Sequence, residues 1–190
     1  MSKEIRAFYT DTTIRVYQAY NDKIADSALA NQRFVEPWSS TRMTWIKPSA
    51  IWMGYRSGWG HKDINQSRIL ALNLYRPMFD ELLANAVPAS AKENIRDVIV
   101  QWDPERTIGE LSFEPNKNAY TSVLPETRSL QMGLSSKISV MLTMNNGPLL
   151  HSITDMTSVF NEIGHCLSTG MLSRAKELLS EHCSEQLYNY

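Results

Sequence analysis

The chain has 190 residues, of which 43% are hydrophobic and 21% are charged, and its formal net charge is −1. This length and composition fit one globular domain over residues 1–190 with a buried core. A net charge near zero gives no global field that would attract nucleic acid or an acidic membrane surface. The sequence contains no apolar run of about 18 residues, so no membrane span is predicted.

The cysteines and the first residues of the chain indicate the cellular compartment. The opening segment MSKEIRAFYTD lacks the apolar stretch of a secretory signal peptide. Cys166 and Cys183 are the only cysteines, and neither is accompanied by ligands at zinc-site spacing. We therefore expect two reduced thiols in a cytoplasmic protein, and we predict no metal site.

The first elements are a strand and a helix. The segment TIRVYQA at 13–19 alternates side chains and is rich in strand-forming residues. This alternation places Arg15 and Tyr17 on one face, which is either an ordinary solvent face or the wall of a cleft. Asp22 then serves as a candidate N-cap for a helix over residues 22–34.

The segment RMTWIKPSAIWMGYRSGWG at 42–60 begins with a predicted short strand at 42–46. Pro48 forces Lys47 into an extended conformation and can itself start a helix. We expect this helix to run to about Ser57, with Gly58 as its C-cap. The proline therefore divides the segment into an extended arm and a helix.

The same segment carries the strongest functional signal. A core segment normally excludes unpaired cations, whereas a surface segment rarely contains three tryptophans. We interpret it as a pocket wall with stacking aromatic rings and guanidinium groups that grip an anion. The alternative is a core helix whose arginine stems lie along apolar surface. The predicted substrate-binding residues are Arg42, Trp45, Lys47, Ser49, Trp52 and Arg56, with Arg15 and Tyr17 from the first strand.

The remaining pattern completes a mixed fold. Strands are predicted at 68–75, 98–102 and 128–134, and helices at 76–86, 136–143, 157–168 and 172–182. Residues 150–156 fit either a strand or the edge of a helix, and 109–126 predict a long surface loop. The order lacks regular βαβ alternation and a glycine-rich phosphate loop. It predicts an α+β fold with a mixed, mostly antiparallel sheet flanked by helices.

The strand at 98–102 ends in QWDPER, a second candidate for function. Asp-Pro alone is a common turn device, but a carboxylate at a strand end can also act as a general base. Asp103 and Glu105 are therefore candidate catalytic residues, together with Tyr55. The four histidines show no metal-ligand spacing, and the sequence has no GxSxG or CxxC motif.

Several of these segments also carry a family resemblance. The strings TIRVYQAYNDKIADSALANQRF, RMTWIKPSAIWMGYRSGWG, QWDPER and RSLQMGL resemble the family catalogued as domain of unknown function 4291. The resemblance covers nearly the whole chain. Because the family name states no activity, it supports the choice of segments and supplies no reaction.

The element order is also loosely similar to that of ADP-ribosyltransferases. That similarity implies a polar residue on an early strand, here Arg15 or Gln18. It further implies a hydroxyl or aromatic residue on the next strand and helix, here Tyr55 or Ser49, and a later glutamate, here Glu105.

We therefore expect an enzyme with a small-molecule substrate, foremost a transferase acting on NAD or another nucleotide-like anion. Trp52 would stack on the nicotinamide or adenine ring, Arg56 and Lys47 would hold the pyrophosphate, and Glu105 would orient a ribose hydroxyl. One alternative is a cofactor-independent cyclase or isomerase of specialised metabolism, in which Asp103, Glu105 or Tyr55 would move protons. Another is a non-catalytic module for single-stranded nucleic acid, which the net charge disfavours.

Overall fold

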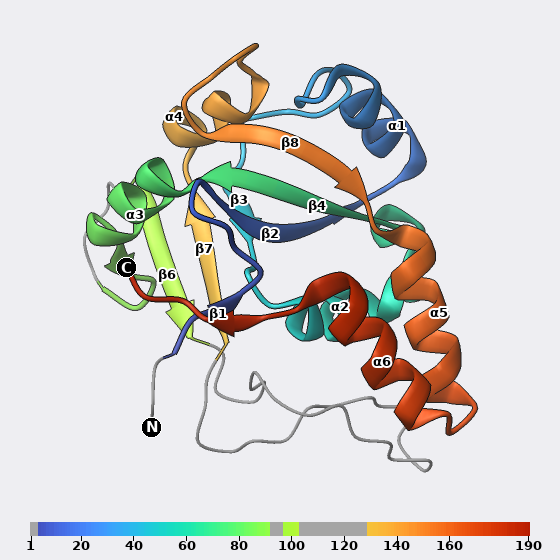
Figure 1. Ribbon diagram of the computed structural model, residues 1–190. Coiled ribbons are helices and arrows are strands. Elements are labelled where there is room, and N and C mark those ends of the chain that lie inside the picture. The colour runs from blue at the N-terminus through green and yellow to red at the C-terminus, as the bar shows by residue number, and fades with distance from the viewer. Residues whose placement is uncertain (1–3, 92–96, 103–128) are drawn as a thin grey trace.

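The computed structural model describes residues 4–91, 97–102 and 129–190, which form an α+β fold with three small sheets (Figure 1). The first sheet is antiparallel and has the order β2 (Thr13–Tyr20), β4 (Arg68–Tyr75), β8 (Leu150–Asp155). The second has the order β3 (Thr44–Ile46), β7 (Leu130–Leu134), β6 (Val98–Trp102), β5 (Val87–Pro88). In it β5 and β6 pair in parallel, and the other neighbours are antiparallel.

Helices surround these sheets. They are α1 (Asp22–Asn31), α2 (Ala50–Ser57), α3 (Arg76–Ala84), α4 (Ser136–Ser139), α5 (Thr157–Ser168) and α6 (Leu172–Cys183). Short 3₁₀ turns follow at Gly58–Gly60, Ile64–Gln66 and Val140–Thr143. Helices α5 and α6 pack against each other at one side of the molecule (Figure 1). In the described part of the chain, every helix is too short or too polar to cross a bilayer.

The alternation of side chains along β2 and β4 divides the core in two. Val16, Leu70 and Leu72 belong to a cluster that includes residues of β3 and β7. Tyr17 and Ala71 point the opposite way and pack with residues of α2, α5 and α6. Strand β4 is therefore covered on both faces, which explains its nearly continuous apolar sequence.

One backbone contact joins the first sheet to the segment after β3. The amide nitrogen of Tyr17 donates a hydrogen bond of 2.8 Å to the carbonyl oxygen of Lys47. This contact fixes the end of β2 beside β3 and the start of α2. It places polar residues of β2 next to the cationic residues of the 42–60 segment.

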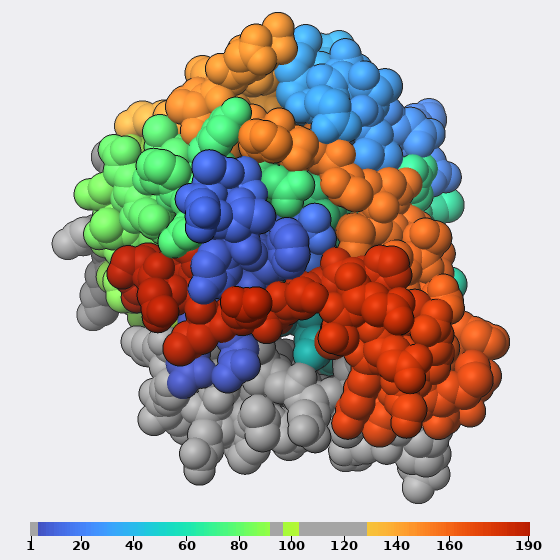
Figure 2. All heavy atoms as spheres, in the orientation of Figure 1, coloured from blue at the N-terminus to red at the C-terminus, as the bar shows by residue number. Residues whose placement is uncertain are grey.

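The C-terminal segment crosses the surface beside the N-terminal residues (Figure 2). There β9 (Gln186–Leu187) pairs with β1 (Arg6–Ala7). Tyr188 is buried, and the Arg76 guanidinium lies 5.0 Å from its ring centroid and 5.0 Å from that of Tyr9. The two ends of the described chain are thus held together by a strand pair and by cation–π contacts.

The α+β class and most predicted elements are confirmed, with several corrections to their details. The predicted single sheet is divided into three. Asn21, rather than Asp22, caps α1, because its side chain accepts a hydrogen bond of 3.0 Å from the amide nitrogen of Ile24. That helix ends at Asn31, short of the predicted 34. The helix predicted at 136–143 changes to a 3₁₀ turn after Ser139, and residues 150–155 form a strand.

The predicted boundaries of α2 are largely confirmed. The side-chain oxygen of Ser49 accepts a hydrogen bond of 3.3 Å from the amide nitrogen of Trp52, so Ser49 is the N-cap. Gly58 ends the helix in the left-handed region at φ 56°. The helix is anchored at both ends, and it carries Arg56 in its last turn.

Candidate functional site

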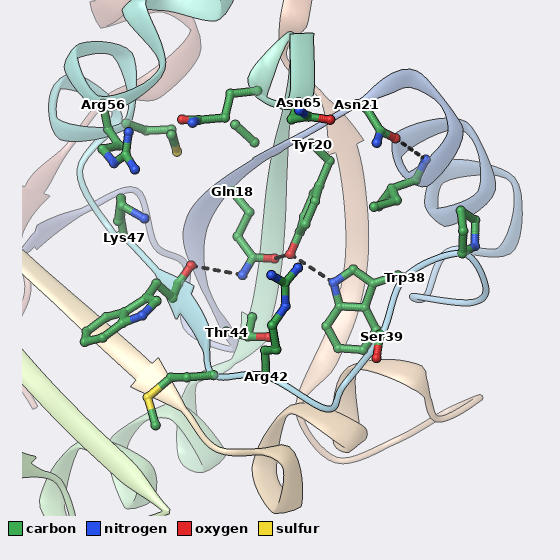
Figure 3. Close-up of a pocket in the computed structure, with 17 residues that line it drawn as sticks. Gln18, Tyr20, Asn21, Trp38, Ser39, Arg42, Thr44, Lys47, Arg56 and Asn65 are labelled. Atoms are coloured by element: carbon green, nitrogen blue, oxygen red, sulfur yellow. Dashed lines mark hydrogen bonds between the residues drawn. The ribbon is translucent and has the colours of Figure 1, made fainter. Parts of the chain in front are cut away.

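A pocket of about 530 Å³ lies where the end of β2, the loop before β3, and α2 meet (Figure 3). Its walls come from residues 18–21, 37–39, 42–45 and 65–66, together with Ile24, Lys47, Met53 and Arg56. Most of these side chains are polar or charged. The volume falls within the range of small-molecule sites, which is roughly 300–1,000 Å³.

Three cations meet in this pocket. Lys47 and Arg56 lie on one side, and Arg42 reaches toward Gln18 and Tyr20 (Figure 3). The lining contains no aspartate or glutamate among the described residues. None of the three cations is within 4.0 Å of a carboxylate in that part of the chain. Among the described residues, the pocket therefore presents positive charge without a counterion.

Lys47 is the most constrained of the three. Its residue is only 7% exposed, and its Nζ lies 5.9 Å from the centroid of the Trp52 ring. Burial, followed by the nearby charge of Arg56, lowers the pKa of the Lys47 amine from 10.5 to about 8. Arg42 and Arg56 are exposed. The pocket thus has a buried amine and two guanidinium groups closer to solvent.

A hydrogen-bonded wall faces these cations. The indole Nε1 of Trp38 donates to the Tyr20 hydroxyl at 3.0 Å, and that hydroxyl donates to Oε1 of Gln18 at 2.9 Å. Nε2 of Gln18 donates to the carbonyl oxygen of Trp45 at 3.0 Å. Burial raises the pKa of Tyr20 above its ordinary value, despite the opposing effects of Trp38 and Arg42. The wall is fixed, and Tyr20 stays protonated.

Four predicted substrate-binding residues come together in the pocket. Arg42, Trp45, Lys47 and Arg56 all line it, although they belong to the loop before β3, to β3, to the segment after it and to α2. Trp52 does not line the pocket but lies beneath the Lys47 amine. The predicted common face of Ser49, Trp52 and Arg56 therefore reaches the pocket through Arg56 alone.

Other predicted residues lie elsewhere. Arg15 packs over Phe8 and hydrogen-bonds with Asn73 and with the carbonyl oxygen of His182, away from the pocket. Tyr17 is fully buried, with its ring centroid 5.7 Å from that of Phe160.

Two further predicted residues are also outside the pocket lining. Ser49 is buried as the N-cap of α2, and Tyr55 lies against Trp52, with their ring centroids 6.1 Å apart. The candidate carboxylates Asp103 and Glu105 lie outside the described residues.

Sequence reasoning missed part of the wall. Tyr20 and Trp38 are not among the predicted site residues, and Gln18 is a candidate only as a polar residue of the first strand. One signal was available, because Gln18 and Tyr20 occupy alternate positions of a strand and so share a face. No comparable signal existed for Trp38, whose loop position depends on tertiary packing.

A separate group of titratable side chains lies at the start of α2. Glu185 accepts a hydrogen bond from the amide nitrogen of Ala50, yet burial raises its pKa to about 8. Burial likewise raises the pKa of Cys183 to about 12, which makes its thiol unreactive. Cys183 and Cys166 are both free and buried. This group stabilises the helix end and contributes no side chain to the pocket.

The chain matches the model of one protein family. A family model described as a domain of unknown function, DUF4291, matches residues 4–188. No curated protein matches the chain with significant similarity. Neither result assigns an activity to the pocket.

Proposed function

The chain belongs to the DUF4291 family, and from this premise we propose that it is an enzyme that binds a small, nucleotide-like anion in the pocket between β2, β3 and α2. The observation that carries the proposal is the convergence of Arg42, Lys47 and Arg56 without a carboxylate among the described lining residues. Burying an amine without a counterion costs free energy, so such an arrangement is typical of a site completed by a ligand.

The aromatic residues favour a ligand with a planar ring. Trp38 and Trp45 line the same pocket as the three cations. Indole faces stack on nucleobases and on pyridine rings, while guanidinium groups bind phosphate oxygens in pairs. A phosphate or pyrophosphate next to a ring uses both features. The likeness in element order to ADP-ribosyltransferases makes NAD one ligand to test, and transfer of a group from a nucleotide one reaction.

The alternatives have less support. A lipophilic substrate of a cyclase would leave most of the polar lining unsatisfied, because buried polar groups need partners. A single-stranded nucleic acid would need cations spaced along a groove, whereas these three meet in one pocket.

Calorimetric titration tests the proposal with ADP-ribose, NAD, ATP and pyrophosphate. We expect at least one of them to bind, with an affinity that falls as salt is added. Arg56→Ala should weaken binding about tenfold to a hundredfold, since a hydrogen bond to a charged group contributes about 1.5–3 kcal/mol. Because Arg56 is exposed, its loss should change the free energy of unfolding by only about 0.5 kcal/mol.

The matched control is Arg174→Ala. Arg174 is a half-exposed arginine on α6 whose charge partners are surface glutamates. Its removal should leave ligand binding unchanged. Absence of measurable binding by all four ligands to the wild-type protein would rule out the proposed function.

A further inference from the structure

The described pocket lining contains few groups that could take part in chemistry near neutral pH. It has no aspartate, glutamate, histidine or cysteine. Its arginines stay charged under all physiological conditions. The Tyr20 hydroxyl is held between Trp38 and Gln18, and burial raises its pKa. This leaves the Lys47 amine as the one described lining group that can gain and lose a proton in the neutral range.

The backbone of Lys47 is held in place on two sides. Its carbonyl oxygen accepts the hydrogen bond from Tyr17 that joins β2 to this segment. Pro48 follows directly and restricts the conformation of Lys47. The side chain is buried and extends into the pocket (Figure 3). Its amine lies 5.9 Å from the centroid of the Trp52 ring. The amine is therefore positioned rather than freely mobile.

The surroundings of the amine make its charged form less favourable than it is in water. Apolar burial and the adjacent Arg56 guanidinium both disfavour a second positive charge, and they lower the pKa of Lys47. A lysine desolvated in this way, or placed next to another cation, is the recognised form of a nucleophilic lysine.

We propose that Lys47 is the nucleophile of the pocket, and that it forms an imine with the carbonyl carbon of a substrate whose anionic group is held by Arg42 and Arg56. The inference rests on the proposed function, because it assumes that the pocket binds an anion. It keeps only the anion-binding part of that proposal and assigns a different class of substrate, an aldehyde or ketone that carries phosphate or carboxylate. Phosphorylated sugars in their open-chain form belong to this class.

The step balances with the substrate and the lysine alone. The Nζ lone pair forms a bond to the carbonyl carbon, and the carbonyl π electrons move to oxygen. A proton passes from nitrogen to that oxygen and gives a carbinolamine. The C–O bond then breaks, the hydroxyl leaves as water with the second proton of the amine, and the nitrogen lone pair forms the C=N bond of a neutral imine. No oxidant or reductant is consumed.

The burial of the three cationic residues agrees with Lys47 as the nucleophile and with the two arginines as the groups that hold the anion. Lys47 is 7% exposed, whereas Arg42 and Arg56 are exposed. A substrate with its anionic group nearer solvent would direct its carbonyl end toward the amine. The Trp52 ring beneath Lys47 limits the approach of water from that side.

Borohydride trapping with pyridoxal phosphate tests the inference, because this probe combines an aldehyde, a phosphate and a planar ring. The protein is incubated with the probe and reduced, and the modified lysines are identified by peptide mass spectrometry. We expect Lys47 to be modified faster than every other lysine. Arg56→Ala should slow this modification about tenfold, as should replacing the probe with pyridoxal, which lacks the phosphate.

Two variants provide matched controls. Lys47→Arg keeps the positive charge but removes the nucleophile, and it should abolish the fast modification. Lys62→Arg changes an exposed lysine outside the pocket and should leave it unaffected. Pyrophosphate binding is measured in parallel by calorimetry. If pyrophosphate binds but Lys47 is modified no faster than Lys62, the nucleophile assignment is wrong and the anion site stands. If none of pyrophosphate, ADP-ribose, NAD and ATP binds and Lys47 is not preferred, both proposals fail.

Discussion

Replacement of Trp59 by alanine is expected to lower the free energy of unfolding by about 3–5 kcal/mol. Trp59 is 1% exposed, and its ring centroid lies 5.4 Å from that of Phe160 in α5. The indole fills space that two glycines leave open. A Cβ at Gly54 would lie 2.5 Å from the indole, and one at Gly164 would lie 2.7 Å from the Trp59 Cβ. Its removal would leave a large cavity between α2 and α5.

This expectation separates Trp59 from the pocket. Within the 42–60 segment, Trp59 belongs to the core, whereas Trp45 lines the pocket. Urea unfolding followed by circular dichroism measures the free energy of unfolding of each variant. Trp45→Ala, at a partly exposed position, is the control and should destabilise the protein less than Trp59→Ala. Equal losses would contradict the assignment of Trp59 to the core.

Replacement of Lys47 by methionine is expected to raise the free energy of unfolding by about 3 kcal/mol at pH 7, because the change in amine pKa from 10.5 to about 8 has this size. Methionine keeps a similar length and removes a desolvated charge. A stabilising substitution at a buried position is unusual, and it indicates that the native residue is kept for function.

The stabilisation by Lys47→Met should depend on pH, because the folded and unfolded chains release the Lys47 proton at different pH values. Between pH 8 and 10.5 the unfolded chain keeps the Lys47 proton and the folded protein has released it. The free energy of unfolding of the wild type therefore rises between pH 8 and pH 10.5. The stabilisation by Lys47→Met has its full size below pH 8 and is lost above pH 10.5. Arg56, whose charge acts on the amine, stays charged throughout.

Thermal and urea unfolding at pH 7 and at pH 10 measure this difference. Lys47→Arg retains the charge and should not raise the free energy of unfolding. A loss of stability in Lys47→Met at pH 7 would mean that the amine has a structural partner, and the unpaired-cation account would be wrong.

Much of the fold could be predicted because its signals are local. The apolar run of β4, the Pro48 break and the Gly58 cap each act through neighbouring residues, and the structure has the elements where these signals place them. The two-residue strands β1, β5 and β9 carry no periodicity and were not predicted. Their pairing depends on contacts between distant parts of the chain.

The candidate site was predictable only in part, for the same reason. The cations of the 42–60 segment could be recognised from composition. Their opposite wall comes from β2, which the Tyr17–Lys47 hydrogen bond joins to this segment, and from the loop through Trp38, whose indole donates to the Tyr20 hydroxyl. Arg15 shares a strand with Gln18, but it lies at an odd position and so points to the other face. Sequence alternation alone did not reveal which face carries the site.

A crystal soaked in tungstate tests the central claim most directly, because this dense anion mimics phosphate and gives an anomalous signal. We predict an anomalous peak in the pocket, within hydrogen-bonding distance of Lys47 and of at least one of Arg42 and Arg56, and its absence in Arg42→Ala/Arg56→Ala crystals. An ordered, solvent-accessible pocket without a tungstate peak, or one in which a carboxylate neutralises Lys47, would contradict the claim that these cations await an anionic ligand.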